Sequence, residues 1–373
     1  MPEHQWFDAE TRELLQRYGF DREWFDAQRK KLQAGTVSRE SNQIRGQVEI
    51  PQQGDVSPLS APGSEEHTRL SRIGEAAIRS GEVGMVVLAG GMATRFGGVV
   101  KALVEVFDGH TFLDLKLADG VAAAERAGGR VPVYLMTSFA TEGPIGDAVR
   151  DRNDVRSPAR VFAQFVSVRL TPEGEPFVTD GAPSLYAPGH GDFSFALRRS
   201  GVLSQFREQG GKHLFMSNVD NLVATLDPAV VGAHIDFGRP ITVEVADKAP
   251  GDKGGAPARV DDVLQIVESF RFPEAFDQDR IPVFNTNTLL FNAEAIDREF
   301  DLTWFAVEKK VDDRVAIQFE RLVGELTAFL DSTFLRVERE GTHGRFQPIK
   351  NPPDLDERRE SIRAILKGRG FPT

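Results

Sequence analysis

Glycines and basic residues follow a short apolar run near residue 85, and this combination could bind phosphate. The run from Met85 to Ala89 leads into AGGMATRFGG (89–98), and Lys101 follows shortly after. Glycine lets backbone N–H groups approach a ligand because it has no Cβ, while Arg95 and Lys101 add positive charge. The pattern matches neither a Walker A loop nor a G-x-G-x-x-G loop. It predicts an anion-binding loop of another kind, with a solvated glycine-rich turn as the alternative.

A carboxylate follows a second apolar run. SNVDNL (217–222) places Asp220 beside Asn218 and Asn221, directly after HLFMS. A carboxylate at a strand end suits a divalent cation that also contacts substrate phosphate oxygens. An Asx turn that ends the strand is the alternative interpretation.

Two asparagines occur at alternate positions of a third run. VFNTNTLLF (283–291) contains Asn285 and Asn287, which would lie on one face of a strand. Two amides that face the same way suit the hydroxyl groups of a sugar. A cross-strand ladder of amides is the alternative.

Two further segments carry isolated polar residues. LYAPGHGDFSFAL (185–197) places His190 between two glycines, so we expect its imidazole to be exposed on a tight turn, and Asp192 is expected to cap the following helix. GRFQPIKNPPDL (344–355) isolates Lys350 before a Pro-Pro turn. A solvated lysine is the alternative for Lys350.

The sequence offers no supported protein nucleophile. It contains no cysteine and no G-x-S-x-G motif, and its seven histidines have no metal-ligand spacing. The absence of cysteine excludes disulfides, Cys-ligated zinc and thiol catalysis. We infer a reaction in which a substrate supplies the nucleophile and the protein supplies position and charge.

Short apolar runs that alternate with helical segments must position these residues. This alternation predicts an α/β fold with a doubly wound, mostly parallel sheet, in which ligands bind beyond the carboxyl ends of the strands. The candidate strands are MVVLA (85–89), VPVYLM (131–136), RVFAQF (160–165), HLFMS (213–217), ITVEVA (241–246) and TLLFN (288–292). Helix starts are predicted at Thr111, with Asp114 completing a capping box, and at Asp227-Pro228.

The first 80 residues have a different pattern. Residues 4–34 show the helical spacing of two amphipathic helices, and residues 67–80 predict a third helix. The segment between them, 42–67, is rich in Pro, Gly, Ser and Gln and predicts an extended connector. No chemistry is assigned to this region.

Charge and hydropathy exclude several partners. The chain has 56 acidic and 45 basic residues, a net charge of -11, which argues against nucleic-acid binding because that needs a basic face. The N-terminal residues lack the apolar core of a signal peptide, and no apolar run is long enough for a membrane span. We expect a cytoplasmic protein.

From about Val86 to Leu355, eight ordered motifs resemble the UTP–glucose-1-phosphate uridylyltransferase (UDP-glucose pyrophosphorylase) family of eukaryotic type. They are LAGGMATRFGGVVKAL, TFLDLKL, VPVYLMTSF, APGHGDFSFALRRSGVL, FMSNVDNLVATLDP, DKGG, FNTNTLLF and GRFQPIKNPPDL. The resemblance implies a Rossmann-like mixed sheet of the nucleotide-diphospho-sugar transferase (GT-A-like) kind. It also implies that UTP and a sugar 1-phosphate give a UDP-sugar and pyrophosphate.

The resemblance also implies roles for individual residues. UTP would be bound by Leu88, Gly90, Gly91, Met136, Gln164 and Gly189. The sugar phosphate would be bound by His190, Asn218, Gly255, Asn285 and Asn287. The catalytic cations would be Arg95, Lys101 and Lys350, and Asp220 would hold Mg²⁺.

Family features leave the preferred sugar open. PGHGD and FNTN favour glucose 1-phosphate, whereas Arg95 is similar to the related UDP-N-acetylglucosamine pyrophosphorylases, so N-acetylglucosamine 1-phosphate and galactose 1-phosphate stay as alternatives. A glycosyltransferase that uses a UDP-sugar, or a non-catalytic sensor of nucleotide sugars, would be different classes of function. The oligomeric state is left open.

The expected domains are an N-terminal helical extension with its connector (1–80), a catalytic domain (81–345) and a short C-terminal segment (346–373). No C-terminal β-helix domain is expected.

Overall fold

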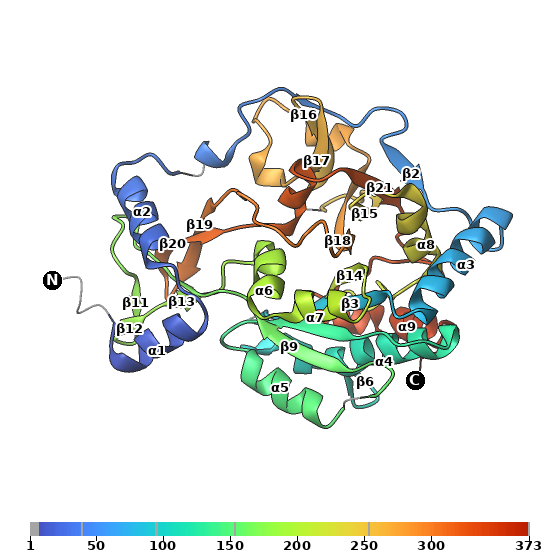
Figure 1. Cartoon of the computed structure of the whole chain (residues 1–373). Coiled ribbons are helices and arrows are strands. Elements are labelled where there is room, and N and C mark those ends of the chain that lie inside the picture. The colour runs from blue at the N-terminus through green and yellow to red at the C-terminus, as the bar shows by residue number, and fades with distance from the viewer. Residues whose placement is uncertain (1–6, 39, 94–95, 153, 253, 372–373) are drawn as a thin grey trace.

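The computed structural model describes residues 7–38, 40–93, 96–152, 154–252 and 254–371. An eight-stranded mixed sheet forms its centre (Figure 1). In spatial order the strands are β2 (Val56–Pro58), β21 (Ser332–Arg336), β15 (Ile241–Asp247), β18 (Val283–Asn292), β14 (His213–Asn218), β3 (Val83–Leu88), β8 (Val133–Thr137) and β9 (Ala159–Ala163).

The sheet is mostly parallel, as the sequence predicts. Only β18 runs against its neighbours, β14 and β15, and the other neighbouring pairs are parallel. Six of the eight strands fall on the predicted runs. β2 and β21 were not predicted, because β2 is a three-residue strand inside the Pro-rich connector and β21 is a short run without a clear turn signal around it.

Helices cover both faces of the sheet. One apolar cluster joins the first face of β3 to α3 (Glu65–Arg79), α4 (Phe112–Ala127), α8 (Pro228–Phe237) and α9 (Pro352–Gly368). A second cluster joins the opposite face to α6 (Phe193–Arg199) and α7 (Val202–Glu208). Because β3 is buried on both faces, its sequence is an uninterrupted apolar run. α5 (Glu142–Arg150) packs beside β9 (Figure 1).

Local signals placed the starts of α4 and α8 correctly, whereas the predicted Pro-Pro turn proves to be the start of a helix. The capping box of Thr111 and Asp114 begins α4, and Asp227 caps α8, whose first residue is Pro228. The Pro-Pro pair after Lys350 is not a turn of a loop. It forms the first turn of α9, which the side chain of Asn351 caps, because proline is favourable at a helix start.

The N-terminal helices pack away from the central sheet. α1 (Ala9–Arg17) and α2 (Arg22–Gln33) confirm the two predicted helices, and they share an apolar cluster with β19 (Phe305–Val311) and β20 (Arg314–Glu320) (Figure 1). The connector contains β1 (Val48–Glu49) and β2, which joins the edge of the main sheet. The limits of the three expected domains stay a prediction.

Short strands complete the described fold. A small sheet consists of β1, β16 (Ala256–Val260) and β17 (Val263–Val267). Four two-stranded ribbons besides β19–β20 are β4 (Met92–Ala93) with β5 (Val99–Val100), β6 (Glu105–Phe107) with β7 (His110–Thr111), β10 (Ser167–Val168) with β13 (Leu185–Tyr186), and β11 (Val178–Thr179) with β12 (Ala182–Pro183). None of the described helices combines the length and apolar character needed to cross a bilayer.

Candidate active site

The carboxyl ends of three neighbouring strands bring the predicted residues to one edge of the sheet. Leu88 ends β3 and pairs with Met136 of β8 on one side and with Asn218 of β14 on the other. The N–H of Val219 donates to the carbonyl of Leu88 at 3.2 Å. Residues from three separate parts of the sequence therefore meet at the edge where ligands bind in such sheets.

Gly90 lies against the side chain of Gln164. A Cβ built on Gly90 would lie 2.1 Å from Gln164 Nε2, so no larger residue fits without moving this amide. The N–H of Gln164 donates to Thr137 O at 2.9 Å, which holds the residue beside the end of β8. Gln164 Oε1 is buried and accepts no hydrogen bond from the described residues. Space around Gly91 is open.

Lys101 and Asp220 form an ion pair at the same edge. Lys101 Nζ contacts Asp220 Oδ2, and the Lys101 N–H donates to Gly91 O at 3.3 Å. The second oxygen, Asp220 Oδ1, is buried and has no hydrogen-bond partner among the described residues. The N–H of Ile349 donates to Asp220 O at 3.1 Å, so the exposed Lys350 follows directly after this contact. Arg95 lies outside the described residues.

This orphaned oxygen fits a divalent cation. Among the described residues, no group of three or more His, Cys, Asp or Glu side chains could hold a metal. Mg²⁺ commonly uses only one or two protein carboxylates and takes its other ligands from water and substrate phosphates. Asp220 alone therefore suits a cation that binds together with a phosphate-bearing substrate, and it does not suit a permanent structural metal.

A buried lysine supports the loop that carries Asn218 and Asp220. Lys116 of α4 donates from Nζ to Ser217 Oγ at 3.0 Å, Asn221 O at 2.8 Å and Ala224 O at 3.0 Å. Burial lowers the pKa of Lys116 to about 8, partly offset by the nearby acidic groups. Three acceptors around one ammonium group fix both ends of the loop.

Three asparagines and one glycine form a continuous hydrogen-bonded chain. Asn287 Nδ2 donates to Asn218 Oδ1 at 2.9 Å, and the N–H of Asn287 donates to Asn285 Oδ1 at 2.9 Å. The N–H of Asn285 donates to Gly255 O at 2.8 Å. The structure therefore brings Gly255, Asn218, Asn285 and Asn287 together.

The strand around this asparagine pair is irregular. The pairing of β15 with β18 shifts after Glu244, and Asn287 has φ of 57°, in the left-handed region that asparagine tolerates better than most residues. The simple alternation along a regular strand that the sequence predicted is thus incorrect. A bulge places the two side chains.

His190 is half-buried, which corrects the expectation of an exposed imidazole. Its Nδ1 accepts the N–H of Val323 at 3.0 Å, and the neighbouring Gly191 N–H donates to Arg321 O at 2.9 Å. Gly189 has φ of 107°, and a Cβ on Gly191 would lie 2.3 Å from the Arg321 carbonyl carbon. The turn needs its glycines because it lies directly on another backbone segment.

The contacts of His190 define its protonation state. A backbone N–H can only donate, so Nδ1 must carry a lone pair and Nε2 must carry the proton in the neutral ring. Burial lowers the pKa of His190 to about 4. His190 is therefore a neutral donor through Nε2.

Asp192 lies at the predicted N-cap position of α6, but its side chain does not cap the helix. No side-chain capping bond is present at the start of α6. Instead Asp192 Oδ1 accepts from Arg321 Nε at 2.6 Å, and Oδ2 accepts from the N–H of Phe165 at 2.8 Å. This buried ion pair joins the residue after Gln164 to the turn of His190.

Sequence reasoning missed Lys116 and Arg321. Lys116 carried a signal, because a lysine between Leu115 and Leu117 interrupts an apolar stretch of a helix. No local sequence signal pointed to Arg321, because its partner Asp192 lies 129 residues away in the chain.

The fold is that of solved sugar-nucleotide pyrophosphorylases. The structure is similar to a UDP-N-acetylglucosamine pyrophosphorylase from Trypanosoma brucei, with a TM-score of 0.77 and 19% identity over 94% of this chain and 79% of that one. It is also similar to a UDP-glucose pyrophosphorylase mutant from Leishmania major, with a TM-score of 0.71 and 25% identity over 89% and 73% of the two chains.

The sequence defines the family. Residues 36–360 match the profile described as UTP–glucose-1-phosphate uridylyltransferase, so the chain belongs to that family. A family member from Encephalitozoon cuniculi, also named UTP–glucose-1-phosphate uridylyltransferase, is 29% identical over 288 residues. That match covers 74% of this chain and 57% of the relative, so the chain spans less than two thirds of that relative's length.

We expect the His190 imidazole to titrate near pH 4 and not near its ordinary pH 6.5. The folded protein then binds fewer protons here than the unfolded chain, so the stability contributed by His190 is complete above about pH 6.5 and falls as the pH decreases toward 4. NMR titration of the ring resonance, assigned with His190→Gln, measures this. A midpoint at pH 6 or above would contradict the burial and the Val323 contact.

Proposed function

We propose that this chain transfers a uridylyl group from UTP to a sugar 1-phosphate, with glucose 1-phosphate as the first choice, and releases pyrophosphate. The fold would then be the GT-A-like form of the nucleotide-diphospho-sugar transferases. The observation that carries this proposal is the meeting of the Gly90–Gln164 contact and the Lys101–Asp220 pair at one sheet edge. One half suits a nucleobase, and the other half suits a polyphosphate.

The nucleotide half rests on Gln164. Its amide has an acceptor oxygen and a donor NH₂ group, which match the N3–H and the O4 of uracil. Gln164 Oε1 has no hydrogen-bond partner among the described residues, so its acceptor is available to a base. Gly90 and Gly91 leave backbone exposed beside it, where a base and its phosphates can approach.

The phosphate half rests on cations. An oxygen of the sugar 1-phosphate forms a bond to the α-phosphorus of UTP, and the bond from that phosphorus to the leaving pyrophosphate breaks. Both reactants are anionic, so repulsion and orientation form much of the barrier. Lys101 would exchange Asp220 for a phosphate oxygen, and Lys350 would approach the same charge.

Asp220 would hold Mg²⁺ through its orphaned Oδ1. The ion would neutralise phosphate charge as pyrophosphate leaves. No protein general base is needed, because a phosphate monoester is already ionised near neutral pH.

The sugar half rests on the asparagine chain and His190. Amides of Asn218, Asn285 and Asn287 are already ordered by one another, so they would meet sugar hydroxyls or phosphate without reorganising. The neutral His190 would donate from Nε2. The similarity to a T. brucei UDP-N-acetylglucosamine pyrophosphorylase keeps N-acetylglucosamine 1-phosphate as the second candidate substrate.

Pyrophosphate release from UTP and Mg²⁺ over a panel of sugar 1-phosphates tests the proposal. We expect release with glucose 1-phosphate to exceed that with N-acetylglucosamine 1-phosphate or galactose 1-phosphate. A different order would keep the reaction and change the substrate. No release with any of them, from folded protein that binds UDP-glucose, would contradict the proposal and favour a glycosyltransferase or a sensor.

The substitution Gly90→Ala should raise the KM for UTP by roughly tenfold or more. The new Cβ would meet Gln164 Nε2 at 2.1 Å and push the amide from its position, and overpacking of this kind costs about 1–3 kcal/mol. A double-mutant cycle supplies the control. In the Gln164→Ala background the same substitution should have little further effect on KM, because the clashing amide is gone. Full additivity would contradict the contact.

Lys101→Ala should lower turnover on the order of 10²- to 10³-fold. Asp220→Asn should weaken the Mg²⁺ dependence together with the activity. The matched control is Lys212→Ala, because Lys212 forms a similar pair with Glu82 at 2.6 Å at the opposite edge of the same strands. A folded Lys101→Ala enzyme with near-normal turnover, or an unchanged Mg²⁺ titration in Asp220→Asn, would contradict these roles.

A further inference from the structure

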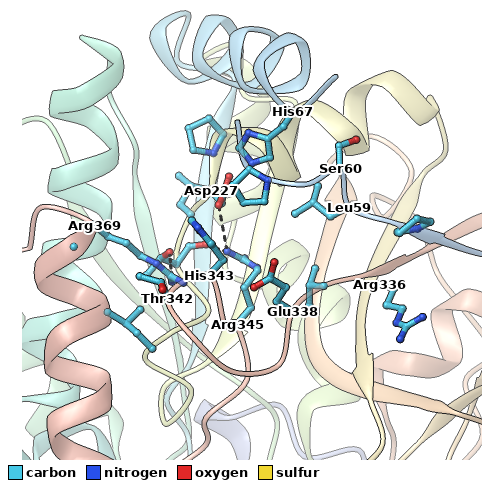
Figure 2. A pocket seen from close by; sticks show the side chains of 18 of the residues that line it. Leu59, Ser60, His67, Asp227, Arg336, Glu338, Thr342, His343, Arg345 and Arg369 are labelled. Atoms are coloured by element: carbon cyan, nitrogen blue, oxygen red, sulfur yellow. Dashed lines mark hydrogen bonds and ion pairs between the residues drawn. The ribbon is translucent and has the colours of Figure 1, made fainter. Parts of the chain in front are cut away.

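A cavity lies at the β2–β21 side of the sheet. It has a volume of about 740 Å³ and lies between the start of α8, the C-terminal end of α9 and the segment that precedes α3 (Figure 2). None of the residues assigned to the active site lines it. Its volume falls within the range of small-molecule sites.

Arg345 lines this cavity and has one guanidinium nitrogen without a hydrogen-bond partner among the described residues. Its side chain is only 2% exposed, and one edge of its guanidinium binds Glu244, with Nη2 at 2.6 Å from Oε1 and Nε at 2.8 Å from Oε2. Its Nη1 has no hydrogen-bond partner among the described residues, and Asp227 Oδ2 lies 3.8 Å away (Figure 2). A buried donor without a partner is unfavourable.

Arg369 adds a second guanidinium to the same cavity. Nη1 donates to Val223 O at 2.6 Å and Thr225 Oγ1 at 3.0 Å, and Nη2 donates to Gly344 O at 2.8 Å. Within the described ranges no carboxylate lies within ion-pair distance of Arg369. Burial and the positive charge of Arg345 lower the pKa of Arg369 to about 10. Arg369 thus brings a guanidinium without a carboxylate partner to a cavity that also holds the unpartnered Nη1 of Arg345, and both features favour an anion.

The acidic residues of the cavity do not remove this preference. Asp247 pairs with Arg336 at 2.7 Å, and Asp227 accepts the N–H of Ala229 as the cap of α8. Glu338 is exposed at the rim. Glu244 is the counter-ion of Arg345, whereas Arg369 remains without a carboxylate partner among the described residues.

The arrangement of donors indicates the kind of anion. A planar carboxylate pairs best with two parallel N–H groups of one guanidinium, but Glu244 already uses that edge of Arg345. The remaining donors belong to different residues, Arg345 Nη1, Thr342 and His343, which lie around the cavity (Figure 2). A tetrahedral phosphate can accept from several directions at once.

We propose that this cavity binds a small phosphorylated molecule through Arg345 and Arg369, at a site separate from the active site. The proposal goes beyond the uridylyl transfer and does not depend on it.

One segment connects the two sites. Arg345 O accepts from Asn221 Nδ2 at 3.0 Å, the N–H of Gln347 donates to Asn221 Oδ1 at 3.1 Å, and Ile349 binds the backbone of Asp220. A ligand that shifts the side chain of Arg345 would therefore also shift the segment from Arg345 to Lys350.

Isothermal titration of the full-length chain, without UTP, tests the proposal with inorganic phosphate and glycerol 3-phosphate as probes. We expect saturable binding that Arg369→Gln weakens about tenfold, because a charge-assisted contact is lost. His343→Ala, at an exposed position, should weaken it as well and guards against misfolding of the first variant. Arg363→Gln is the matched control, because this arginine of the same helix binds Asp108 away from the cavity.

Three outcomes would overturn the proposal. The first is that the unmodified chain shows no saturable binding. The second is that Arg369→Gln and His343→Ala both bind as tightly as the unmodified chain. The third is that Lys101→Ala abolishes binding, which would place the phosphate in the active site. None of these results depends on pyrophosphate release, so a failure here is distinct from a failure of the proposed function.

Discussion

The buried pair of Asp192 and Arg321 holds the two halves of the candidate site together. Asp192 binds Arg321 and the backbone of Phe165, while the Arg321 backbone binds Pro188 and Gly191. The guanidinium also lies over the rings of Phe165, Phe195 and Trp304. Removal of one partner from such a pair leaves an uncompensated charge, at a cost of about 3–5 kcal/mol. This pair therefore helps to fix the spacing of Gln164 and His190, together with the backbone bonds at Thr137 and Val323.

A second constraint is the sheet edge itself. Parallel neighbours bring the ends of β3, β8 and β14 to one level, and Lys116 then fixes the loop after β14 from below. Because the backbone already fixes the positions of Asn218 and Asp220, neither residue would need to be repositioned in the proposed reaction. This agrees with a reaction in which the protein contributes charge and position and the substrates contribute the reacting atoms.

The ion pair between Lys101 and Asp220 bears on how the proposed site would bind UTP. Each group neutralises the other, so the site carries little excess charge before a substrate arrives. In a chain with a net charge of -11, the overall field repels a triphosphate. The proposed reaction would therefore need local cations to offset that repulsion, and Lys101 would supply one of them by exchanging Asp220 for phosphate.

The sequence alone determined six of the eight strands of the main sheet, the two N-terminal helices and the helix caps at Thr111 and Asp227, because these follow from local periodicity and capping chemistry. It did not determine the burial of His190, the partners of Asp192 or the bulge at Asn287. Those depend on Arg321, Val323 and Glu244, which are distant in sequence. Only the tertiary structure brings such residues into contact, since no local pattern records a partner tens of residues or more away.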